Sequence, residues 1–158
     1  MRHIPLLSIA ALTLFCILAP AAHAAPPKPC DLLSHPAAEA LFGAPLKSTL
    51  EAGTLACIYS NSETSAINIH FQAIPDGAPP TYGPTIMKAI LHKDYDADAV
   101  DSVPGLGDQN FFITSKQPKS TFTVLYHKTI VTLIVTGAKN PNLRAAMIQT
   151  MKQALTKF

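Results

Sequence analysis

The chain has 158 residues, of which 48% are hydrophobic and 14% are charged, and its net charge is +2. A nucleic-acid-binding domain would need basic residues clustered on one face, and the sequence holds no such cluster. The length fits one domain that buries a sizeable core. Composition therefore argues against nucleic acid as a partner and favours a single globular domain.

Residues 1–24 have the three parts of a secretory signal peptide. Arg2 gives a basic start, residues 6–19 form an uncharged apolar segment, and the small-residue site Ala22-His23-Ala24 follows. The apolar segment is shorter than the roughly 20 residues that a membrane-spanning helix needs. We predict cleavage between Ala24 and Ala25. The product is then soluble, not embedded in the membrane, and located in the periplasm or outside the cell.

The cysteines predict one disulfide. Cys16 leaves with the signal peptide, so Cys30 and Cys57 enter an oxidising compartment together and have only each other as intrachain partners. Their spacing is unlike a C-x-x-C redox or metal pair. Residues 27–29, Pro-Lys-Pro, do not resemble the small-residue site that precedes a lipidated cysteine. We therefore expect a chain that is not lipidated.

The N-terminal half predicts a leader, a helix and two strands. Residues 25–29 are proline-rich and predict a flexible leader, so the domain spans residues 30–158. Ser34 is a good helix N-cap and Gly43 a good stop, which predicts a helix over Pro36–Phe42. Cys57–Ser60 is typical of a strand. Apolar and polar residues alternate in Ala66–Ile74, which indicates a strand with one buried and one wet face.

The C-terminal half predicts a helix, three strands and a final helix. The helix covers 84–92, and a strand covers 111–114. The segments 121–126 and 129–136 form a hairpin in which Val124 faces Val131 and Phe122 faces Leu133. Its connection, His127-Lys128, lacks the Gly or Asn of a tight turn, so we allow a loop longer by a residue or two. Asn140 is expected to cap the last helix, with Pro141 in its first turn.

The order helix, two strands, helix, three strands, helix predicts an α+β fold. Hairpin-length gaps favour an antiparallel sheet, here of about five strands. We expect the helices to pack on one face of this sheet.

Two short motifs are interpreted as loops. The acidic segment 94–101 lacks the Gly and Glu that a calcium-binding EF-hand loop needs at fixed positions, so we expect a solvated loop, with weak calcium binding as the alternative. The run 105–108, Gly-Leu-Gly-Asp, resembles the start of a phosphate loop. It precedes a strand, not a helix, and predicts a turn.

Catalytic and metal-binding motifs are missing from the sequence. His35, His70, His92 and His127 have no zinc-site spacing, and no nucleophile elbow or paired acids occur. We therefore predict no cofactor and no metal ion. His70, on the wet face of its strand, is the histidine with the best position for a ligand.

Three pieces of the chain resemble a group of small exported bacterial proteins of unknown function. They are residues 30–33 with Glu39-Ala40 and Gly43, then Cys57-Ile58-Tyr59, then residues 103–108 before Phe111-Phe112. The resemblance implies a compact α/β sandwich of the PsbP-like sort, with the two cysteines bridged. Many members are lipoproteins, and this chain lacks their lipidation cysteine. The resemblance implies no catalytic residue.

These observations favour a non-enzymatic binding module for a small molecule, an envelope component or a protein. An inhibitor or accessory subunit of an envelope enzyme is the second hypothesis, and an unrecognised hydrolase is the third. The oligomeric state is left open.

Overall fold

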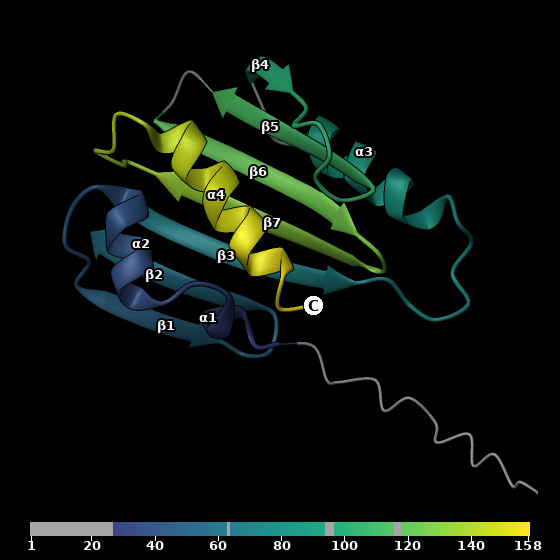
Figure 1. Cartoon of the computed structure of the whole chain (residues 1–158), viewed down its shortest axis with the longest axis horizontal. Helices are drawn as coiled ribbons and strands as arrows, with labels where there is room; N and C mark the ends of the chain where they lie inside the picture. Colours follow the sequence, from purple (N-terminus) through teal and green to yellow (C-terminus); the bar gives the residue numbers. More distant parts are fainter. Residues whose placement is uncertain (1–26, 63, 94–96, 116–117) are drawn as a thin grey trace, which may run out of the picture.

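The computed structural model describes residues 27–62, 64–93, 97–115 and 118–158. They form a seven-stranded antiparallel sheet with four helices (Figure 1). In chain order these are α1 (Pro29–Leu32), α2 (His35–Phe42), β1 (Ser48–Ala52), β2 (Ala56–Ser62), β3 (Ser65–Ala73), α3 (Tyr82–Lys93), β4 (Ala97–Asp101), β5 (Gln109–Ser115), β6 (Lys119–Tyr126), β7 (Thr129–Thr136) and α4 (Leu143–Leu155). In the described part of the chain, no helix is long and apolar enough to span a membrane. The α+β class and the antiparallel sheet agree with the sequence.

The strands lie in the order β1-β2-β3-β7-β6-β5-β4. The chain builds one half of the sheet from β1 to β3, crosses over through α3, and builds the other half from β4 to β7. The last strand, β7, returns to the middle and pairs with β3 from Ala66 opposite Thr136 to Ala73 opposite Thr129. The two halves are therefore joined by a long central antiparallel pair.

The helices cover the two faces of the sheet unequally. We call the face that contacts α1, α2 and α4 the front face; these helices lie before the sheet in Figure 1. Its core joins inward residues of all three helices to β2, β3, β5, β6 and β7. On the opposite face, which we call the back face, α3 packs through Met87 against β5, β6 and β7. The expectation that all helices share one face is therefore wrong.

The central hairpin has the predicted register. Val124 pairs with Val131 and Phe122 with Leu133, and all four side chains are buried on the front face. His127 and Lys128 alone form the turn, and His127 adopts a left-handed φ of 52°. A two-residue turn needs this conformation, which non-glycine residues adopt at a modest cost.

The sheet has two more strands than the five or so predicted from the sequence. Each of the two unforeseen strands, β1 and β4, forms an edge of the sheet. All five residues of β1 are exposed, so its sequence has no burial alternation to detect. The segment Ala97–Asp101, expected to be part of a solvated acidic loop, pairs with β5 instead. Edge strands pair on one side only, and their side chains need not be apolar.

The ends of α2 confirm the predicted N-cap, Ser34, and the predicted stop, Gly43. The Ser34 side chain accepts a hydrogen bond from the Ala37 N–H at 3.4 Å, and Gly43 ends α2 with a φ of 79°. A β-carbon at Gly43 would also lie 2.7 Å from the Asn140 nitrogen, so glycine is required there twice over. The additional helix α1 begins at Pro29, inside the expected leader, and Pro29 is buried.

The start of α4 differs from the prediction. Its N-cap is Asn142 rather than Asn140. The Asn140 amide donates to the carbonyls of Ala40 and Leu41, both at 3.2 Å, and its oxygen accepts from the Asn142 N–H at 2.8 Å. Asn140 therefore satisfies the open carbonyl end of α2 and positions α4 beside it.

Candidate functional site

The predicted disulfide is present. Cys30 of α1 and Cys57 of β2 are bonded, with their α-carbons 5.0 Å apart. Beside it, the buried Tyr59 hydroxyl donates to the Leu33 carbonyl just after α1. The bond and this contact fix α1 on the front face, so the two cysteines are structural.

The Gly-Leu-Gly-Asp motif forms the predicted turn. Gly105 and Gly107 have φ values of 72° and 66°. A β-carbon at Gly107 would lie 2.5 Å from the Leu125 carbonyl oxygen, and the Asp108 N–H donates to that oxygen at 2.7 Å. The glycines thus allow the loop to close onto β6, and strand β5 follows.

The described part of the acidic segment, Ala97–Asp101, is strand β4 and not a loop. Asp94 and Asp96 lie outside the described residues. Asp101 pairs with Arg144 of α4 at 3.0 Å, and this guanidinium also lies 5.0 Å from the centre of the Phe112 ring. No cluster of three potential metal ligands occurs among the described residues.

The histidines are dispersed over the fold. His35 contacts the Thr49 hydroxyl at 2.8 Å and the Glu39 carboxylate at 3.5 Å at the start of α2. His92 belongs to α3, and His127 lies in the β6–β7 turn. His70 points to the back face from the middle of β3, as the alternation predicted, and it borders a cavity.

This cavity, which we call the His70 groove, has a volume of about 710 Å³. It lies where β2 begins beside β3, on the half of the sheet that α3 leaves uncovered. Seven residues line it: Leu55, Ala56, Asn68, His70, Phe71, Gln72 and Ala73. Four of the seven are apolar, and the three polar ones alternate along β3. Its size falls in the range of small-ligand sites.

Polar side chains cross the back face in register with His70. His70 lies opposite Thr132 on β7, and Thr132 lies opposite Thr123 on β6. The two threonines are buried, and their hydroxyls are 3.2 Å apart. His70 is therefore the groove end of a polar row that continues beneath the covered half of the sheet.

Asn68 lies two residues before His70 on β3, on the same face, and its amide oxygen lacks a hydrogen-bond partner among the described residues. Its Oδ1 atom is buried and has no hydrogen-bond partner in the described chain. Its register neighbours on the two sides are Ile58 and Ile134, which offer no donor from their side chains. Leaving a buried amide oxygen unpaired costs about 1–3 kcal/mol. A ligand donor would recover that energy if the Asn68 side chain turned its oxygen into the groove.

The His70 imidazole is half-buried, and this burial lowers its pKa below the ordinary value of 6.5. It has no hydrogen-bond partner among the described residues. None of the seven residues that line the groove is an acid. The groove therefore offers an imidazole and an amide as hydrogen-bonding groups, without the carboxylate that would make an acid–base couple with His70.

Two exposed leucines lie near the groove. Leu55 borders it and is 60% exposed. Leu50 on β1, which is 59% exposed, faces the same side as Ile58, its partner in register. The sequence analysis did not single out either residue. Their signal, isolated leucines among polar residues, is too common to mark a site by itself.

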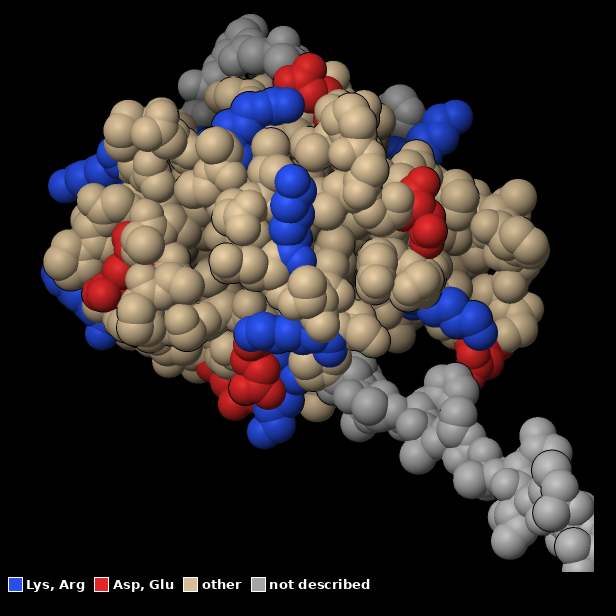
Figure 2. Space-filling model, viewed as in Figure 1, with Lys and Arg blue, Asp and Glu red and all other residues tan. Residues whose placement is uncertain are grey.

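Among the described residues, the front face, opposite the His70 groove, carries no concentration of charge of one sign in Figure 2. Lysines, arginines and acids are scattered over the front face in Figure 2, with most of the surface uncharged. This distribution gives no electrostatic footprint for a polyanion on that face.

Comparison of the chain with known protein families, with curated proteins and with solved structures finds no match. The resemblance to small exported proteins stays a prediction.

Proposed function

We propose that this chain is an exported, non-enzymatic binding module that holds a small amphipathic molecule in the His70 groove. One observation carries the proposal: a mostly apolar cavity of ligand size is lined by Asn68, whose buried amide oxygen has no hydrogen-bond partner among the described residues. A mostly apolar pocket with a few convergent polar groups is the usual form of a small-molecule site.

The residues that line the groove indicate which chemical groups the ligand carries. Leu55 and Ala56 favour an apolar body, whereas Asn68 Oδ1 needs a hydrogen-bond donor such as a hydroxyl or an amide N–H. Desolvation disfavours the charged imidazole, so His70 supports a neutral polar group at the same end. The expected ligand is therefore uncharged where it meets β3 and apolar beyond.

The proposed location follows from the first 57 residues. The signal-like segment 1–24 would direct the chain out of the cytoplasm, and the Cys30–Cys57 bond is stable in the oxidising compartment that the chain would reach. The ligand would then be a molecule of the envelope or of its surroundings.

The test is recovery of the ligand with the protein. The full chain is produced with its own leader, purified from the envelope fraction, and weighed by native mass spectrometry. We expect a mass excess that disappears on denaturation. Ala56→Trp fills the groove opposite His70 and should abolish this excess. The matched control is Ala89→Trp on the exposed side of α3, which should retain it.

A wild-type protein without any bound small molecule, or an Ala56→Trp variant that retains it, would contradict the proposal. His70→Leu provides a second check. It keeps the cavity apolar but removes the polar group, and we expect about tenfold weaker retention of the ligand, as for loss of one buried hydrogen bond.

A protein partner is the second candidate, favoured by the exposed Leu50 and Leu55. In that case the same purification would yield a bound polypeptide. Leu50→Ser, which lies outside the groove lining, would release it without affecting any small molecule.

A further inference from the structure

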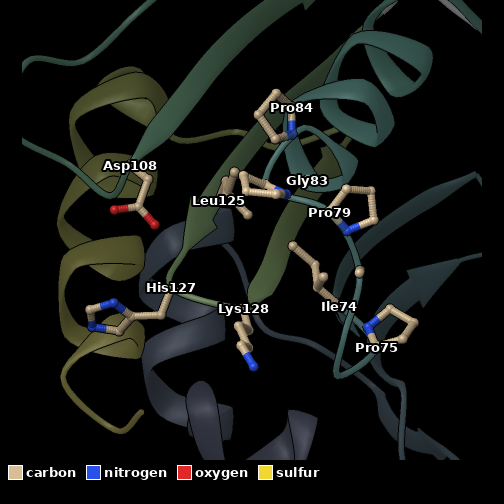
Figure 3. A pocket seen from close by; sticks show the side chains of 11 residues that line it. Ile74, Pro75, Pro79, Gly83, Pro84, Asp108, Leu125, His127 and Lys128 are labelled. Carbon is tan, nitrogen blue, oxygen red and sulfur yellow. The ribbon is translucent and has the colours of Figure 1, made fainter.

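A second cavity, separate in chemistry from the His70 groove, lies beside the β6–β7 turn (Figure 3). Its volume is about 390 Å³. It is bordered by the loop that leaves β3, the start of α3, and the hairpin turn. Its lining residues are Ile74, Pro75, Ala78, Pro79, Pro80, Gly83, Pro84, Asp108, Leu125, His127 and Lys128. We call it the proline pocket.

Four prolines stiffen one side of this pocket. Their rings fix the backbone φ, and the intervening loop is closed by the Ala78 N–H on the Pro75 carbonyl and the Tyr82 N–H on the Pro79 carbonyl. The Ile74 N–H donates to the Lys128 carbonyl at 2.7 Å and joins the loop to the hairpin. A rigid wall loses little conformational entropy when a ligand binds.

On the other side of the pocket lies the carboxylate of Asp108, and the backbone of this residue is also fixed. Asp108 follows Gly107, whose missing β-carbon lets the loop approach β6, and the Asp108 N–H donates to the Leu125 carbonyl. In Figure 3, Asp108 and His127 lie on one side, Pro75 and Pro79 on the other, with Leu125 and Gly83 between them. A molecule seated over Leu125 would therefore have a carboxylate beside it.

The two oppositely charged side chains of the pocket, Asp108 and Lys128, differ in their partners. The Lys128 ammonium already has an acid partner, Asp76, at 2.8 Å. The Asp108 carboxylate has neither an ion pair nor a hydrogen bond with any described residue. The pocket thus combines an apolar floor, from Ile74 and Leu125, with an exposed carboxylate that is free to pair with a ligand.

We propose that the proline pocket binds an apolar organic ammonium, such as an amine or the N-terminal residue of a peptide. The ammonium pairs with Asp108, and the apolar group lies on Leu125 and Ile74 against the proline wall. This site is independent of the His70 groove and of the ligand proposed there.

The test uses two probes that differ in one charge. Leucinamide carries an ammonium and an apolar side chain, and N-acetyl-leucinamide has the same side chain without the charge. Amide chemical shifts of the full-length protein are followed by NMR at low salt as each probe is added. We expect leucinamide to saturate with a Kd of about millimolar and to shift Ile74 and Leu125. The acetylated probe should bind about threefold more weakly, because an exposed ion pair is worth that much.

Asp108→Asn removes the charge without changing the shape of the side chain. In this variant the two probes should bind equally, with leucinamide weakened about threefold. The matched control is Glu51→Gln, an exposed acid on β1 that does not line the pocket, which should leave both affinities unchanged.

Any one of four results would overturn the proposal. The first is that leucinamide fails to saturate by about 50 mM, a limit set by the millimolar affinity expected. The second is that the two probes bind the wild-type protein with equal affinity. The third is that Asp108→Asn retains the difference in affinity between the two probes. Shifts confined to the His70 groove would also overturn it, and would leave the function proposed for that groove untouched.

Discussion

The two faces of the sheet are built from the same strands but are covered differently. Three helices and a disulfide cover the front face, and its side chains form one continuous core. On the back face a single helix covers β5 to β7, and its smaller core holds five buried residues. The part of the back face around β2 and β3 carries the His70 groove.

This difference separates the face that holds the main core from the part of the sheet on which we propose ligand binding. On the front face, apolar contacts satisfy nearly every inward position. On the open part of the back face, the Asn68 amide oxygen and the His70 imidazole have no hydrogen-bond partners among the described residues. A polar group held in a sheet without a partner is costly, and such groups are retained in proteins mostly where they contact something else. The open part is therefore the better place to look for function.

Neighbouring residues of β7 provide the largest test of this comparison. Leu133 is fully buried on the front face, and Ile134 is partly exposed on the back face. We expect Leu133→Ala to lower the free energy of unfolding by about 2–5 kcal/mol, because it leaves a cavity in the core. Ile134→Ala should cost about 1 kcal/mol, because that side chain buries less surface. Urea denaturation of both variants gives the two values. Equal costs would show that the open part of the back face is covered in the native protein.

Removing the disulfide tests the front face alone. The bond closes a loop between residues 27 positions apart. The double variant Cys30→Ala, Cys57→Ala should therefore lose about 3 kcal/mol of unfolding free energy, chiefly because its unfolded chain is less restricted. Wild-type protein unfolded in the presence of reductant should have the same free energy of unfolding as the double variant. Ligand bound in the His70 groove should be retained by the folded variant, since neither cysteine lines the groove. Loss of that ligand would show that the His70 groove on the back face depends on the front-face disulfide.

Much of the front face could be predicted from the sequence. Alternation in Ile67, Ile69 and Phe71, and in the 121–136 hairpin, follows from burial of one side of a strand, so strand position and register were both readable. The disulfide followed from counting the cysteines that the predicted signal cleavage would leave. These features depend on residues that are neighbours in sequence or on a single possible pairing.

The arrangement of the back face could not be predicted in the same way. The apolar residues of α3 indicate a helix but do not say which face of the sheet it covers. Strands β1 and β4 lie at the edges, where no inward pattern is needed. His70 was found because it alternates with core residues, whereas the unpaired state of Asn68 depends on Ile58 and Ile134 from two other strands. The proline pocket likewise needs the β3 loop to meet the β6–β7 turn, about 50 residues later in the chain.

The smallest expected effect concerns pH, and it tests whether His70 belongs to the open part as described. Burial lowers the pKa of His70 in the folded protein, so below pH 6.5 the unfolded chain binds a proton more readily than the folded chain. The contribution of His70 to stability is therefore complete above pH 6.5 and is lost as the pH falls toward the lower pKa of the folded state. Urea unfolding between pH 7.5 and about 5 should show a decline that is shallower in His70→Gln. A ligand seated against the neutral imidazole would bury it further and would itself bind more weakly as the pH falls. Identical pH slopes in the two proteins would mean that the imidazole is fully hydrated, and that the groove is too open to hold a small molecule against β3.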